Sequence, residues 1–160
     1  MITRVYIDNF RCFTNFEMRP ERVNLLIGNN GAGKSTFIDV LHRVIGLAVL
    51  SESVQDEFPV NTLTRWDSRS TQRIELDVKG NDGMYEYAVE LSHDPAHETV
   101  TLQRELVKYN TRTVFLFENG MVELQAHRDA ARAWRKRAGQ VASVPSLTDA
   151  KTEVERIDLS

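Results

Sequence analysis

A glycine-rich segment, Gly28–Ser35, constrains the fold of this chain more than any other feature. Its sequence, GNNGAGKS, satisfies the pattern G-x-x-x-x-G-K-[ST]. A compact apolar run, Val23–Ile27, precedes it, and a helical pattern follows it. A loop that wraps a phosphate at a helix N-terminus requires this order of strand, loop and helix. We therefore predict an α/β fold in which residues 23–27 form a buried central strand.

The residue types in this loop suit phosphate binding and predict ATP and Mg²⁺ as cofactors. Gly31 and Gly33 allow a positive φ and a close approach of the backbone to phosphate oxygens. Lys34, the candidate catalytic residue, supplies a charge for the outer phosphates, and the Ser35 hydroxyl suits the shell of a magnesium ion. Backbone N–H groups from Gly31 to Thr36 would form an anion nest. The predicted nucleotide-binding residues of the loop are Asn29, Asn30, Gly31, Ala32, Gly33, Lys34, Ser35 and Thr36.

Hydrophobic periodicity predicts a mixed sheet around the helix after the loop, with an antiparallel side sheet. Residues 34–50 have helical periodicity, and the loop at 51–72 is long enough that we expect it to hold a short helix, to be mobile, or both. Strands are predicted before the loop at 2–7 and 10–18. From residue 73 to 125 the period is two, with turns at Asn81–Gly83 and Asn119–Gly120. The predicted lobe therefore spans residues 1–125, with its phosphate-binding loop at 28–36.

Residues 126–160 are predicted to form a basic helical extension. Arg128, Arg132 and Arg135 share one face of such a helix, a pattern that can contact DNA. A solvated helix that packs on another lobe is the alternative. A last polar stretch, 148–159, is also predicted to be helical.

Composition and charge limit the number of domains, the partners and the cellular compartment that we expect for this chain. Its 160 residues suit about one domain, and a net charge of -3 gives no overall attraction to nucleic acid or to anionic lipid. The single cysteine, Cys12, excludes an intramolecular disulfide and favours a reducing compartment, so we expect a cytoplasmic location. No apolar run approaches membrane-spanning length, so no membrane contact is predicted.

The N-terminal pattern supports a family resemblance over about residues 1–50. Ile2, Asn9, Phe10, Arg11 and Phe13, followed by GNNGAGKST, resemble the N-terminal lobe of ABC-type ATPases, in the RecF/SMC-like and OLD-like group of AAA family ATPases. The resemblance implies that Arg11 lies near the nucleotide's phosphates. It also implies a Q-loop glutamine after the side sheet, for which Gln140 is the candidate.

The motifs that complete such an ATPase are not in the sequence. It has no LSGGQ-like signature, no strand that ends in Asp-Glu and no switch histidine. Val114–Glu118 has the apolar-then-acidic pattern of a Walker B strand, but Glu118 precedes Asn119–Gly120, so we predict a turn carboxylate. The resemblance therefore implies half of an ATPase head, completed by a C-terminal lobe. It further implies that two heads enclose ATP as a homodimer, with a role in DNA repair or phage defence.

Two rival functions remain open from the sequence. One is a P-loop kinase with residues 132–137 as a lid, although such enzymes usually place the loop after their first strand. The other is a nucleotide-sensing module that does not hydrolyse ATP. A GTPase is disfavoured because the sequence contains no N-K-x-D motif.

Overall fold

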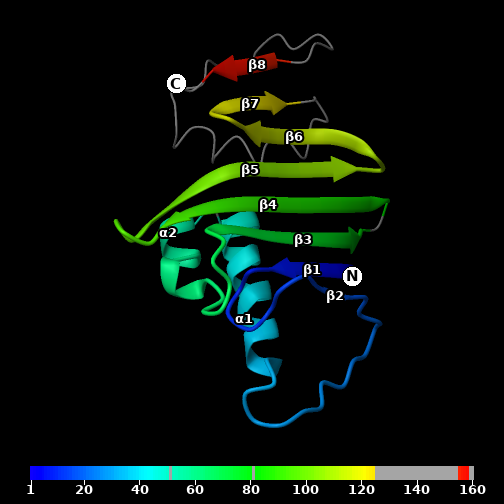
Figure 1. Ribbon diagram of the computed structural model, residues 1–160. Helices are drawn as coiled ribbons and strands as arrows, with labels where there is room; N and C mark the ends of the chain where they lie inside the picture. Colours follow the sequence, from blue (N-terminus) through cyan, green and yellow to red (C-terminus); the bar gives the residue numbers. More distant parts are fainter. Residues whose placement is uncertain (51, 81, 125–154, 159–160) are drawn as a thin grey trace.

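The computed structural model describes residues 1–50, 52–80, 82–124 and 155–158, and one eight-stranded sheet forms its centre (Figure 1). The strand order is β2-β1-β3-β4-β5-β6-β7-β8, and every neighbouring pair is antiparallel. The strands are β1 (Ile2–Asp8), β2 (Phe16–Met18), β3 (Thr71–Lys79), β4 (Met84–Asp94), β5 (Thr99–Tyr109), β6 (Arg112–Glu118), β7 (Met121–Leu124) and β8 (Glu155–Asp158).

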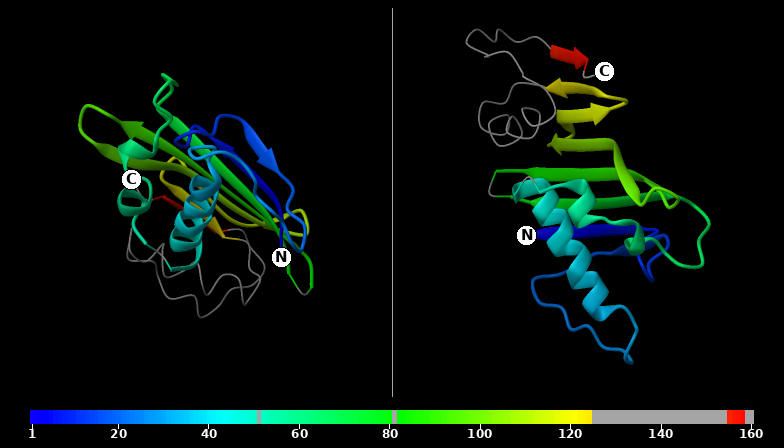
Figure 2. Two further views of the ribbon diagram at one scale, coloured as in Figure 1. Left: turned by 90° about the horizontal axis from the view of Figure 1, so that it is seen from below. Right: turned by 90° about the vertical axis from the view of Figure 1, so that its left-hand side faces the viewer.

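Helices lie against one face of this sheet (Figures 1 and 2). The main helix is α1 (Lys34–Ile45), which continues as a π-helical turn, η1 (Gly46–Leu50). A short helix, α2 (Val54–Glu57), and a 3₁₀ turn, η2 (Val60–Thr62), follow. The helix predicted over 34–50 is therefore confirmed, as is the short helix predicted within 51–72.

The core forms between α1 and the inner face of the sheet. Side chains alternate along a strand, so every second residue of β1, β3 and β4 points toward the helix. The fully buried aliphatic residues of this layer are Val5, Ile7, Ile74, Val89, Leu91, Val40, Val44 and Leu47. On α1, Phe37, Val40 and Val44 are buried, whereas Ile38 and Ile45 are exposed. The helix thus packs on the sheet with one face and leaves another apolar face open.

The outer face of the sheet carries ion pairs between neighbouring strands, whereas Leu106 and Val114 are buried apolar residues. Arg4 on β1 pairs with Glu75 on β3 at 2.7 Å, and Lys108 on β5 pairs with Glu86 on β4 at 3.2 Å. Such partly exposed pairs contribute little stability individually, and their face suits contact with water. The strands predicted over 73–125 are present and antiparallel, but they belong to the same sheet as β1 and β2.

The predicted central strand at 23–27 is not present. Residues 23–27 form no strand, and the exposed fractions of Val23, Leu25 and Ile27 are 85%, 82% and 83%. Their segment leaves β2 and extends beyond the edge of the sheet before it enters α1 (Figure 1). A central strand needs a hydrogen-bonding neighbour on each side. None of the described strands pairs with residues 23–27. The prediction of a mixed sheet around α1 is therefore wrong for the described residues, whose strand pairs are all antiparallel.

Two further predictions need correction. Of the strand predicted at 10–18, only β2 is extended, because Asn9, Arg11 and Asn15 have positive φ and fold residues 9–15 into a compact turn. Of the helix predicted at 148–159, residues 155–158 instead form β8, which pairs with the free hydrogen-bonding edge of β7.

The basic residues at 128–137 and Gln140 lie outside the described residues. Among the residues that are described, no helix has the length and apolar character to cross a membrane.

Candidate nucleotide-binding site

The glycine-rich loop enters α1 with the backbone conformations that its sequence predicts. Gly31 has φ of +83° and Gly33 has φ of +91°, and Gly33 is the N-cap of α1. The Phe37 N–H donates to the Gly33 carbonyl at 2.8 Å, which starts the hydrogen bonds of the helix. Within the described part of the chain, the N–H groups of residues 33–36 have no hydrogen-bond partner. They are free donors at the positive end of the helix dipole.

The Lys34 side chain folds back across its own loop. Its Nζ donates to the Gly28 carbonyl at 2.6 Å and to the Asn29 carbonyl at 2.8 Å. Both hydrogen bonds are exposed, so the amine lies on the solvent side of the loop. Ser35 is exposed and Thr36 is half-buried. The structure therefore groups the ammonium of Lys34 and the hydroxyl of Ser35 around the N-terminus of α1.

The turn at residues 9–13 packs directly beneath the loop, a contact that sequence reasoning missed. A Cβ atom added to Gly33 would lie 3.0 Å from Cys12 Sγ and 3.1 Å from Phe13 Cζ. Such contacts are tighter than nine in ten of those that real Cβ atoms make, so Cys12 and Phe13 would have to shift by a few tenths of an ångström. Packing therefore favours glycine at position 33, in addition to its positive φ.

A buried hydrogen-bond network fixes this turn. The fully buried Asn9 donates from Nδ2 to the carbonyls of Arg69 and Thr71, at 2.8 Å each, and its Oδ1 accepts from the Thr64 N–H. Gln72 Nε2 donates to the Asn9 carbonyl at 2.8 Å. Burial of an amide is favourable only when its polar atoms are paired, as they are here. Asn9 thus joins the turn to the segment that leads into β3.

Arg11 lies at the side of α1. Its Nη1 is 3.1 Å from Asp39 Oδ2, and its Cζ is 5.5 Å from the centre of the Phe10 ring. The Arg11 N–H donates to the Thr62 carbonyl at 2.7 Å. The structure therefore brings the predicted arginine beside the helix that begins at the loop. Asp39, its partner, was missed because an acidic residue on a helix carries no motif by itself.

Comparison with family models gives a match that spans the loop and most of the sheet. Residues 1–112 match the family described as the AAA ATPase domain. The chain belongs to the AAA ATPase domain family. It is thus an ATP-binding ATPase domain of a family with the usual Mg²⁺ dependence, and the match includes the loop, α1 and the strands up to β5. No curated protein matches the chain.

An acidic pair lies at the far end of α1 in this ATPase domain. A Cβ atom added to Gly46 would lie 2.9 Å from Glu57 Oε1 and 3.2 Å from Glu52 Oε2, so both carboxylates gather over this glycine. Burial, followed by the hydrogen bond and charge of Glu52, raises the pKa of Glu57 to about 7. The described residues contain no group of three or more His, Cys, Asp or Glu side chains arranged to hold a metal ion.

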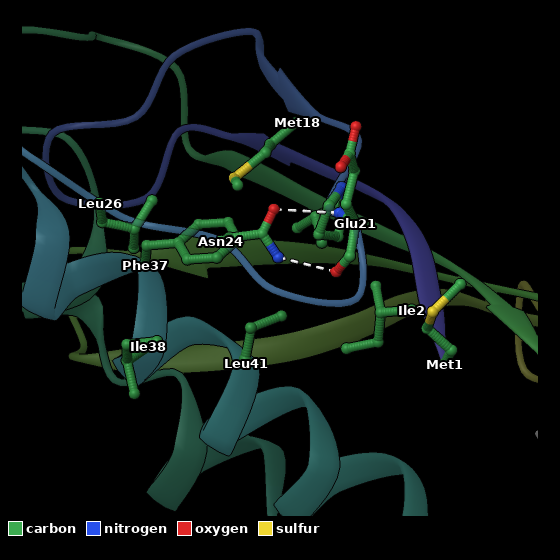
Figure 3. A pocket seen from close by; sticks show the side chains of 11 residues that line it. Met1, Ile2, Met18, Glu21, Asn24, Leu26, Phe37, Ile38 and Leu41 are labelled. Carbon is green, nitrogen blue, oxygen red and sulfur yellow. Dashed lines mark hydrogen bonds between the residues drawn. The ribbon is translucent and has the colours of Figure 1, made fainter.

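The ATPase domain also has an apolar hollow beside α1, with a volume of about 330 Å³ (Figure 3). Ile2 and Met18 line it from the sheet, and Phe37, Ile38 and Leu41 line it from α1. Leu26 and Asn24 close it from the segment before the loop. None of its lining residues belongs to the loop at 28–36. The hollow therefore lies next to the glycine-rich loop, through Phe37 of α1, without being lined by it.

Glu118 does not resemble the metal-binding acid of an ATPase. It pairs with Met121 at the end of the hairpin of β6 and β7, whose turn contains Asn119 and Gly120, both with positive φ. Arg104 Nε lies 3.0 Å from Glu118 Oε1. The prediction of a turn carboxylate is therefore confirmed.

Proposed function

We propose that this chain is the ATP-binding lobe of an ABC-type ATPase of the RecF/SMC-like and OLD-like group. The observation that carries this proposal is the loop before α1, where two glycines with positive φ lead to unpaired N–H groups at the helix N-terminus. Convergent N–H donors at a helix N-terminus are the elementary requirement for binding a phosphate. The family match adds the nucleotide and its chemistry.

In this proposal each residue of the loop has a role toward ATP. Asn29, Asn30, Gly31, Ala32 and Gly33 surround the phosphates with their backbone. Lys34 leaves the carbonyls of residues 28 and 29 and contacts the outer phosphates, and the Thr36 N–H faces the phosphates as part of the anion nest. Bound Mg²⁺ neutralises phosphate charge, and Ser35 is the residue that would hold it. Arg11 contributes its positive charge from the turn at 9–13.

The exposed segment before the loop supports completion by a C-terminal lobe. Val23, Leu25 and Ile27 are apolar, yet each is more than four-fifths exposed. Exposed Ile38 and Ile45 lie on the open face of α1. Exposed apolar side chains of this number suggest a surface that another protein element covers. We infer that strands of the C-terminal lobe flank residues 23–27 and cover this face.

Hydrolysis in this proposal needs groups that the described residues do not supply. The only Walker-B-like string of the sequence ends at Glu118, which lies in a hairpin turn. By family resemblance, the signature helix, the metal-binding acid and the switch histidine come from the C-terminal lobe. Two completed heads would enclose ATP as a homodimer and couple its hydrolysis to DNA repair or phage defence.

Calorimetric titration with Mg-ATP, combined with a phosphate-release assay, tests the proposal on the 160-residue chain. We expect binding of ATP and ADP without steady turnover. Steady turnover that disappears in Lys34→Ala would contradict the assignment of hydrolysis to a second lobe. Failure to bind either nucleotide would overturn the proposal as a whole.

A further inference from the structure

One carboxylate oxygen of Asp39 forms ion pairs with two arginine side chains. Its Oδ2 is 3.1 Å from Arg11 Nη1 and 3.0 Å from Arg43 Nε, which lies one turn further along α1. Arg43 also donates from Nη1 to the Glu57 carbonyl, so a separate contact fixes it. The side chains of Arg11 and Asp39 are 41% and 32% exposed. Their pair is therefore open to water and to a competing anion, whereas Arg43 has a second anchor.

Asp39 lies close to the predicted phosphate position. It follows Ser35 by four positions and Thr36 by three, so the three residues share one face of α1. Side chains on a helix lean toward its N-terminus, and one turn of helix rises about 5.4 Å. The Asp39 carboxylate thus lies about one turn from the free N–H groups that face the phosphates.

The backbone of Arg11 is fixed, but its side chain is not enclosed. The N–H of Arg11 is bound to the Thr62 carbonyl, and its φ of +49° is set within the turn that Asn9 anchors. Its neighbour Cys12 packs against Gly33. A movement of the Arg11 guanidinium toward the loop therefore needs rotation of side-chain bonds only.

We propose that Asp39 is a positioning residue that holds Arg11 while the nucleotide site is empty, and that ATP binding transfers Arg11 from this carboxylate to a phosphate. The inference rests on the proposed function, because it requires a nucleotide at the loop. Arg43 keeps Asp39 paired after the transfer, so the exchange leaves no unpaired carboxylate next to the phosphates. Lys34 is held in a similar way while the site is empty, because its Nζ donates to two carbonyl oxygens of its own loop.

A double-mutant cycle on the 160-residue chain tests this inference, with the Kd for Mg-ATP as the readout. Asp39→Asn removes the competitor of the phosphate, so it should bind ATP about threefold more tightly, the range of an exposed ion pair. Arg11→Gln should bind ATP more weakly. The double variant should have the Kd of Arg11→Gln, because Asp39→Asn tightens ATP binding only by releasing an arginine at position 11.

Three controls separate this role from a structural one. Asp39→Glu should restore the wild-type Kd, and Asp39→Ser should reproduce the tightening if Asp39→Asn folds poorly. Asp56→Asn, the same change of charge at an exposed position on α2, should leave the Kd unchanged. Melting temperatures without nucleotide show that each variant is folded.

The outcomes are distinct from those that test the proposed function. Unchanged or weaker binding by Asp39→Asn would overturn the inference, and so would tightening that persists in the Arg11→Gln background. Either result leaves ATP binding by the wild-type chain intact. Absence of ATP binding by the wild type would overturn the proposed function, and the inference with it.

Discussion

At the scale of single residues, the two positive-φ glycines of the loop differ in their surroundings. A Cβ atom on Gly33 would crowd Cys12 and Phe13, whereas one on Gly31 would meet no atom within 4 Å. The sequence pattern predicts both positive φ values. It does not predict the crowding, because that depends on where the turn at 9–13 folds.

Substitution by alanine at the two glycines should therefore have unequal costs. Gly31→Ala should lower the free energy of unfolding by about 1 kcal/mol, the strain of a left-handed residue with a side chain. Gly33→Ala adds a steric clash and should lower it by about 2–3 kcal/mol. Urea denaturation of both variants measures the difference. Equal costs would show that the turn does not support the loop as described.

The acidic pair at the end of α1 predicts a pH dependence of stability. The pKa of Glu57 is raised from its ordinary 4.5 to about 7 in the folded chain, so between these values the folded state binds more protons than the unfolded state. The free energy of unfolding should therefore fall as pH rises through this window.

Removal of this carboxylate should make the chain more stable at alkaline pH. Because Glu57 is half-buried, we expect Glu57→Gln to gain on the order of 1 kcal/mol at pH 8, and close to nothing at pH 5. Denaturation of the wild type, Glu57→Gln and the control Asp56→Asn at both pH values gives the comparison. A gain of the same size at both pH values would exclude this origin.

At the scale of elements, the segment at 23–27 shows what local sequence determines and what it does not. Its run of apolar residues is typical of a buried strand. Burial of a strand, however, depends on neighbours, and β2, the strand nearest in sequence, ends at Met18. The helix α1, in contrast, keeps its backbone hydrogen bonds within itself and buries one face on β1, β3 and β4, so its periodicity predicts it correctly.

Amide hydrogen exchange should distinguish these two elements. The N–H groups of residues 25–27 should exchange at nearly the rate of an unstructured peptide, because none of the strands that the structure describes pairs with them. Those of Ile74 and Leu76, in the interior of the sheet, should exchange slowly. Exchange at 25–27 as slow as in β3 would show that this segment pairs with a strand.

At the scale of the whole molecule, the local patterns predict the antiparallel strands from β3 to β7 and the helix after the loop, but they wrongly predict a mixed sheet, and long-range contacts account for the errors. The hairpin of β3 and β4 follows from alternation and a turn sequence. The pairing of β8 with β7 joins residues far apart in the chain, and no local pattern contains it. The candidate site likewise has one part that local sequence predicts and another that depends on long-range contacts. The loop at 28–36 is visible in sequence, whereas Asp39 and the network around Asn9 depend on the fold.

The central claim is that the loop before α1 binds the phosphates of ATP, and calorimetric titration of the wild type and Lys34→Ala with Mg-ATP tests it most directly. Among the described residues, the Lys34 amine donates only to the exposed carbonyls of Gly28 and Asn29, so the variant should keep the melting temperature of the wild type. Its Kd for ATP should rise by about tenfold or more, the value of a hydrogen bond to a charged group. Equal affinities of the two proteins, or no ATP binding by either, would contradict the claim.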